Sequence, residues 1–246
     1  MVCERFKLPT EVKCSAVELL DRFMTLHVED MYSFVQESRV ARRRDQWEEF
    51  EGRIANQIVL RVLSCVQIAS KLHSGTQRVS IPQIVEFLQS LGHCYRPPVI
   101  LKSELRILVT LDYKLVSTSP VVYVDTLLGL LARTKIGVCQ TTHRRPCLDL
   151  LEIVLLWRLQ VYQRLLMITT QRPVSAGYSV QHRVVQSDYM LLGTALIVAS
   201  VFVVSKKDSY EITAQHLFDI TKVPMADMID LATAILQQFV AVSQKN

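Results

Sequence analysis

The segment Ile54–Lys71, IANQIVLRVLSCVQIASK, limits the possible folds more than any other part of this sequence. Apolar or small side chains cover almost every side of the helix that it would form. A helix that is hydrophobic all round is buried in a protein core or in a membrane. Arg61 interrupts the run, which therefore lacks the ~18 uncharged apolar residues typical of a spanning helix. We predict a central helix surrounded by other helices.

The composition favours an all-α fold. The chain has 246 residues, of which 50% are hydrophobic and 21% are charged, so it can form a sizeable core. It has only seven glycines and eight prolines, fewer than a β-rich chain with many tight turns would need. A second uncharged run, Tyr189–Ser205, contains small and polar residues and is shorter than a usual membrane span. We predict a second buried central helix there, with a membrane span as the alternative.

Helix start and stop signals divide the chain into two similar halves. In the first half we predict helices over Thr10–Leu26, Ile54–Lys71, Ser80–Leu91 and Val99–Asp112. In the second half we predict helices over Val121–Thr134, Cys147–Thr169, Tyr189–Val204, Thr213–Ile220 and Pro224–Val240. The break around Pro120 places the domain boundary near Val116, which gives domains over residues 1–116 and 117–246.

The most polar segment is His27–Arg53, an unusually long connection for a helical bundle. Its length favours an extra helix or a mobile insert. It contains a basic run, in which Arg39, Arg42, Arg43 and Arg44 lie, followed by the acidic sequence WEEFE. One interpretation is a solvated loop or exposed helix whose opposite charges pair loosely. The other is a basic docking patch or nuclear-import signal formed by these four arginines.

The six cysteines form no C-x-x-C pair, which is typical of reduced thiols in a cytosolic or nuclear protein. A zinc site assembled from His93, Cys94, Cys139, His143 and Cys147 is the alternative, but their spacing matches no common ligand pattern. We expect no cofactor. The N-terminus has no apolar region of the kind found in signal peptides.

The sequence contains no motif of a common enzyme class. It lacks a glycine-rich phosphate loop, an H-E-x-x-H pair and a nucleophile elbow. Polar pairs such as Asp149 and Glu152 share a helix face, but nothing near them in sequence complements them. We therefore predict a protein that is not an enzyme. The net charge of +5 permits an acidic partner without indicating nucleic acid.

Three segments in the first half resemble the cyclin superfamily. FKLPTEVKCSAVELLDRFM (Phe6–Met24) is similar to the second helix of a cyclin box, and QIVLRVLSCVQIASKLHS (Gln57–Ser74) is similar to the central third helix. ILKSELRILVTLDYKLVSTSP (Ile100–Pro120) resembles the fifth helix and the crossover into a second box. The resemblance covers residues 6–120; over 121–246 only the number of helices and the run GTALIVAS match. It implies two tandem cyclin boxes, the second divergent.

The resemblance also implies a function. Cyclin-like proteins are non-catalytic regulators or adaptors that bind a cyclin-dependent kinase or a related partner, here in cell-cycle or meiotic crossover control. The expected location is the nucleus and also the cytoplasm. The alternative is a transcription-factor-type cyclin fold that contacts DNA or transcription proteins, for which Arg39–Arg44, Arg144–Arg145 and Lys206–Lys207 supply the basic residues. No membrane partner is expected; recombination proteins are possible further partners.

By resemblance, Lys71 and Glu104 match the lysine and glutamate through which kinase-binding cyclins contact their kinase. Such a pair could form charge-assisted hydrogen bonds with the backbone of a partner helix. The alternative is that Lys71 only favours its helix C-terminus and that Glu104 is a solvated flank residue, beside the line of Leu101, Leu105 and Leu108. Only nine residues precede Thr10, where the helix that matches the second cyclin-box helix is predicted to begin, so we expect the first box to lack its first helix.

Overall fold

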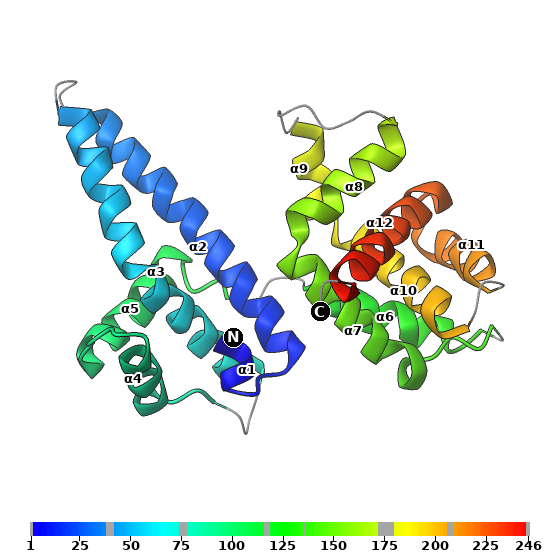
Figure 1. Ribbon diagram of the computed structural model, residues 1–246, viewed down its shortest axis with the longest axis horizontal. Helices are drawn as coiled ribbons and strands as arrows, with labels where there is room; N and C mark the ends of the chain where they lie inside the picture. Colours follow the sequence, from blue (N-terminus) through cyan, green and yellow to red (C-terminus); the bar gives the residue numbers. More distant parts are fainter. Residues whose placement is uncertain are drawn as a thin grey trace. The chain divides into compact units, whose positions relative to one another are not determined.

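The computed structural model describes residues 2–37, 42–73, 78–115, 119–134, 136–171, 180–205 and 209–244. These residues form twelve α-helices and no strand (Figure 1), which confirms the all-α prediction. The chain divides into two compact units, Met1–Ser117 and Thr118–Asn246. Each unit has its own buried central helix.

The first unit contains a long antiparallel helical hairpin and three shorter helices (Figure 1). The helices are α1 (Val2–Arg5), α2 (Thr10–Glu37), α3 (Arg43–His73), α4 (Ile81–Ser90) and α5 (Pro97–Thr110). The hairpin pairs α2 with α3, and α3 also packs on α5. At 1.5 Å per residue, the 31 residues of α3 span about 46 Å, so the outer part of the hairpin extends beyond α4 and α5 (Figure 1).

The inner half of α3 is the predicted central helix. Every residue from 63 to 70 is buried, including the polar Ser64, Gln67 and Ser70. Two serine hydroxyls donate to carbonyls of their own helix, from Ser64 to Leu60 at 2.9 Å and from Ser70 to Gln67 at 2.8 Å. A buried hydroxyl needs such a partner to offset its desolvation. Phe23 of α2 and Ile107 of α5 lie in the same core.

The polar connection His27–Arg53 is mostly helix, because α2 continues to Glu37 and α3 begins at Arg43. The predictions that the first helix ends at Leu26 and that the central helix begins at Ile54 were therefore wrong: the described residues of this connection lengthen the two flanking helices and do not form an extra one. Ion pairs one turn apart support the outer part of α3, from Arg44 to Glu48 at 3.0 Å and from Arg53 to Glu49 at 3.4 Å. An aromatic cluster also joins the two helices; its members are Phe23, His27, Tyr32, Trp47 and Phe50.

The second unit is organised around α10 (Tyr189–Ser205), in which every residue from 191 to 201 is buried. This confirms the prediction of a second buried central helix. The surrounding helices are α6 (Pro120–Leu131), α7 (Gln140–Leu156), α8 (Arg158–Thr170), α9 (Val180–Ser187), α11 (Tyr210–Thr221) and α12 (Met225–Ser243). Gly193 lets α10 approach α6 closely, since a Cβ there would lie 3.0 Å from the Cβ of Tyr123.

The helix boundaries in this unit differ from the prediction at several points, and α7 begins at Gln140 rather than at Cys147. The single helix expected over Cys147–Thr169 is two helices, because Trp157 adopts φ −123° and ψ 33° and interrupts the helical path between α7 and α8. The segment expected to be a loop after Thr170 contains α9. By length and composition α12 alone among the described helices could span a membrane, yet it packs on α8 and α10 with its inner side buried.

Candidate functional site

Lys71 and Glu104 lie together where the end of α3 meets the middle of α5. The Lys71 ammonium forms a salt bridge and hydrogen bond with Oε1 of Glu104. Their environments differ: the Lys71 side chain is 42% exposed, whereas that of Glu104 is only 12% exposed. The pair is therefore at the rim of the core, with the ammonium facing solvent and the carboxylate held mostly beneath it. Glu104 is not a solvated flank residue.

A line of polar contacts continues along the same helix interface. The guanidinium of Arg61 donates to the hydroxyl of Ser103 at 2.9 Å, and the hydroxyls of Ser103 and Ser64 are hydrogen-bonded to each other at 2.8 Å. Together with the Lys71–Glu104 pair, these contacts form the α3–α5 polar seam. Both polar residues that α5 buries are thus bonded to α3. Because hydrogen bonds are directional, the seam fixes the rotation of α5 about its own axis.

The outer side of α5 carries an exposed apolar stripe formed by Leu101, Leu105 and Val109. These side chains are 50%, 52% and 58% exposed. Their spacing of four residues places them on one side of the helix. The sequence placed Leu101 and Leu105 in one line, but the structure shows that this line faces solvent and that Ile100, Ser103, Glu104 and Ile107 face the core. The α3–α5 polar seam explains this orientation of α5, because the contacts with α3 allow Ser103 and Glu104 to face the core.

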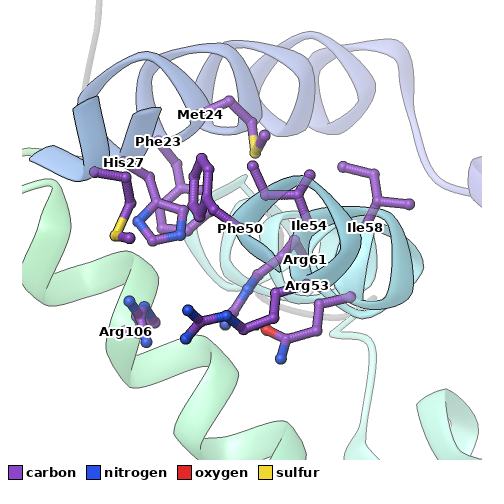
Figure 2. A pocket seen from close by; sticks show the side chains of 11 residues that line it. Phe23, Met24, His27, Phe50, Arg53, Ile54, Ile58, Arg61 and Arg106 are labelled. Atoms are coloured by element: carbon purple, nitrogen blue, oxygen red, sulfur yellow. The ribbon is translucent and has the colours of Figure 1, made fainter. Parts of the chain in front are cut away.

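A small cavity rich in arginine lies between α2, α3 and α5 (Figure 2). Its volume is about 130 Å³. The side chains of Arg53 and Arg61 extend from α3 toward the side where Arg106 lies on α5, and His27 reaches in from α2 (Figure 2). We call this the arginine cavity; its other lining residues are Phe23, Met24, Met31, Phe50, Ile54, Gln57 and Ile58.

Burial and like charges shape the electrostatics of this cavity. Burial lowers the pKa of His27, and the charges of Arg106 and Arg61 lower it further, while Asp30 acts in the opposite direction. The pKa of Arg61 is lowered for the same reasons, first by burial and then by Arg106. The Arg61 guanidinium lies 5.7 Å from the centre of the Phe23 ring and donates to Oε1 of Gln57 at 2.8 Å. These are the contacts of a cation held by neutral groups.

One sign of this cavity is present in the sequence, although the prediction did not use it. Arg61 is the single charge inside the apolar run of the central helix, and Arg53 lies two turns before it on the same face. A charge inside a buried helix needs a structural or functional reason. Arg106 and His27 are distant in sequence, so only the structure brings them to the same cavity.

The predicted basic patch is only partly described. Arg39 lies outside the described residues. Arg42 precedes α3; Arg43 donates to the backbone carbonyl of Gln36 at 2.5 Å, and Arg44 pairs with Glu48. The structure brings none of the three described arginines, Arg42, Arg43 and Arg44, to the Lys71–Glu104 pair.

Other basic residues considered for DNA contact are also paired or undescribed. Arg144 forms two hydrogen bonds with the carboxylate of Asp125, at 2.7 and 3.1 Å, and Arg145 pairs with Asp149 at 2.9 Å. Lys206 and Lys207 lie outside the described residues. The described candidates therefore do not form a free basic stripe.

The cysteines have different environments. Burial raises the pKa of Cys65 and of Cys147 to about 12. Cys139, partly exposed just before α7, instead has a pKa lowered to about 7 by hydrogen bonds with the side chains of Thr141 and Thr142. No group of three or more His, Cys, Asp or Glu side chains in the described parts of the chain is arranged to hold a metal ion.

Comparison with known proteins defines the class of this fold. Residues 1–116 match the family described as Cyclin, N-terminal domain, and these residues include α1 to α5 with the Lys71–Glu104 pair. Cyclin-box proteins are generally non-catalytic regulators, and a cyclin domain suggests protein partners such as kinases. The first unit is therefore a cyclin N-terminal domain.

Two relatives extend the match over nearly the whole chain. Cyclin N-terminal domain-containing protein 1 of Homo sapiens is 30% identical over 239 residues, which are 96% of this chain and 72% of the relative. Its counterpart in Mus musculus is 31% identical over 241 residues, which are 96% of this chain and 71% of the relative. The chain belongs to the family of cyclin N-terminal domain-containing proteins, as a distant homologue of these two.

Proposed function

We propose that this chain is a non-catalytic cyclin-like adaptor that binds a cyclin-dependent kinase or a related protein through the rim of α3 and α5. One observation carries the proposal: the Lys71–Glu104 pair, which the cyclin resemblance singles out, is assembled in the structure beside an exposed apolar stripe. Protein interfaces typically combine an apolar centre with a few charged groups that fix orientation.

The two charged residues have different roles in this proposal. An ammonium has three donors, of which Glu104 takes one, so Lys71 keeps donors for backbone carbonyls at the end of a partner helix. Glu104 is mostly buried and positions the ammonium from below. Leu101, Leu105 and Val109 provide apolar area for the partner. A partner that contacts this surface in only one of its conformations would be shifted toward that conformation.

The wider assignment rests on the same family relationship. We propose that the second unit is a divergent second cyclin box, because a buried central helix, α10, organises it as α3 organises the first. The proposed processes are cell-cycle and meiotic crossover control, with action in the nucleus. Recombination proteins are the further partners that this role would involve.

A co-purification experiment with charge variants tests the interface. The full chain would be expressed with an affinity tag, and associated kinases would be identified and quantified by mass spectrometry. Lys71→Glu and Leu105→Asp should each reduce kinase recovery about tenfold or more, because one places like charge at the contact and the other places a charge in the apolar stripe. Arg78→Glu, exposed before α4, is the matched control.

The control variant and circular dichroism distinguish loss of the proposed contact from loss of folding. The control variant should retain wild-type recovery, and all variants should keep their helical circular dichroism. If a kinase co-purifies equally well with Lys71→Glu and with the unmodified chain, the proposed interface is wrong. Equal losses in all three variants would also contradict it, since Arg78 lies outside the proposed surface.

A further inference from the structure

The arginine cavity concentrates positive charge that no lining residue balances. Arg53, Arg61 and Arg106 line it together with His27, and none of its eleven lining residues is an aspartate or a glutamate. The helices α2, α3 and α5 each contribute at least one of these four side chains (Figure 2). Like charges that share a small cavity repel one another unless an anion lies between them. The composition thus favours an anionic ligand.

The individual contacts of the three arginines also favour an anionic ligand. Arg61 donates to Gln57 and Ser103 and lies over the Phe23 ring, so its bonded partners are neutral. Arg106 is exposed and forms neither an ion pair nor a hydrogen bond with any residue that the structure describes. Arg53 pairs with Glu49 outside the cavity, but both side chains are more than half exposed, so this pair is weak and exchangeable.

The size and the donors of the cavity select the anion. Its volume of about 130 Å³ exceeds the roughly 10–15 Å³ that one water needs, and it is smaller than the roughly 300–1,000 Å³ of pockets that enclose drug-sized ligands. Guanidinium groups present forked donors that match the oxygens of a phosphate or carboxylate. A phosphate monoester has about −1.5 to −2 charges at pH 7 and three acceptor oxygens, so it satisfies three arginines better than a single carboxylate can.

We propose that the arginine cavity binds a phosphate group, either as free phosphate or as a phosphorylated serine or threonine of a partner protein. Arg53 and Arg106 close on the anion from α3 and α5, Arg61 forms the inner wall, and imidazolium formation at His27 adds a fourth donor. Met24, Ile54 and Ile58 line the cavity beside these groups and would contact the carbon atoms that carry a phosphate. The site is distinct from the Lys71–Glu104 pair, so either proposal can fail without the other.

Calorimetric titration of the full chain tests the site. The probes are inorganic phosphate, the N-acetyl amide of O-phosphoserine, and acetate, all at constant ionic strength. Phosphate should bind saturably and acetate much more weakly. Arg53→Gln combined with Arg106→Gln should weaken phosphate binding by about tenfold or more, because each substitution removes a charge-assisted contact. Arg5→Gln combined with Arg78→Gln removes the same charge from exposed positions and should leave binding unchanged.

A second readout reports on the cavity itself. The pKa of the His27 imidazole, followed by NMR, should rise when phosphate binds, because an anion in the cavity would offset the charges of Arg106 and Arg61 that lower this pKa. An unchanged His27 pKa, absent saturation, equal binding of acetate, or equal weakening in the two double variants would each overturn the proposal. Tighter binding of the phosphoserine derivative than of inorganic phosphate would identify a phosphorylated side chain as the source, and the reverse order would identify free phosphate.

Discussion

Removing either member of the Lys71–Glu104 pair should destabilise the first unit, but by different amounts. The structure sets the difference, because the Glu104 side chain is 12% exposed and the Lys71 side chain is 42% exposed. Lys71→Met keeps most of the alkyl stem but leaves a mostly buried carboxylate without its partner. An unpaired buried group of this kind costs about 1–3 kcal/mol, and more when it is charged.

Glu104→Gln should cost less. Glutamine has nearly the same shape and still offers a carbonyl oxygen to the Lys71 ammonium, which can also turn to water. Partly exposed pairs are worth about 0–1 kcal/mol, so we expect a loss of at most about 1 kcal/mol. The double variant should cost less than the sum of the two single variants, because the second substitution removes the group that the first one leaves unpaired.

The assay must report on the first unit alone. The chain has two tryptophans, Trp47 in α3 and Trp157 between α7 and α8. In a Trp157→Phe background, urea unfolding followed by fluorescence reports on the unit that contains Trp47. The free energy of unfolding of Lys71→Met should fall below that of Glu104→Gln. If Glu104→Gln proves the more damaging change, the buried carboxylate is not the dominant cost and the argument fails.

Three further predictions follow from single residues. Gly193→Ala should lower the free energy of unfolding of the second unit by up to about 2 kcal/mol. The reason is that overpacking against Tyr123 costs about 1–3 kcal/mol, whereas the gain in helix propensity is ~1 kcal/mol. A variant that urea unfolding shows to be stabilised would contradict the close approach of α10 to α6. Cys139 should react with iodoacetamide half-maximally near pH 7, well below the 9.0 of an unperturbed thiol, whereas buried Cys147 should stay unreactive in peptide mapping. His27 has a lowered pKa in the folded state, so the free energy of unfolding should decline as pH falls below 6.5, where the unfolded imidazole takes up a proton more readily than the folded one. The decline should be smaller in His27→Gln. Parallel curves of unfolding free energy against pH for the two proteins would exclude the effect.

The sequence predicted the two central helices because their apolar residues leave no side for water. An apolar surface on all sides can be recognised from the composition of one segment alone. Arg61 and the two buried serines of α3 were too few to obscure it. The outer part of the hairpin was harder to predict from the sequence, because its stability comes from contacts between α2 and α3 rather than from an apolar stripe on either helix. Ion pairs such as Arg44–Glu48 and the stacked Phe23 and His27 rings supply these contacts.

The inner face of α5 could not be predicted from its own pattern. Leucine, isoleucine and valine occur on more than one side of this helix, so its periodicity permits several orientations. The correct one buries Ser103 and Glu104, which is favourable only because Arg61, Ser64 and Lys71 of α3 are placed to bond them. Sequence resemblance identified Lys71 and Glu104 individually, but their direct pairing depends on how the two helices meet.

The α3–α5 polar seam has a thermodynamic consequence for recognition. A helix packed only by interchangeable aliphatic side chains can roll by several degrees at little cost, and a partner that needs one orientation must supply the free energy to select it. In α5, bonds to Ser103 and Glu104 restrict that roll before any partner arrives. Leu101, Leu105 and Val109 are thus held in one arrangement in the free protein, so little conformational entropy remains to be lost when they are covered.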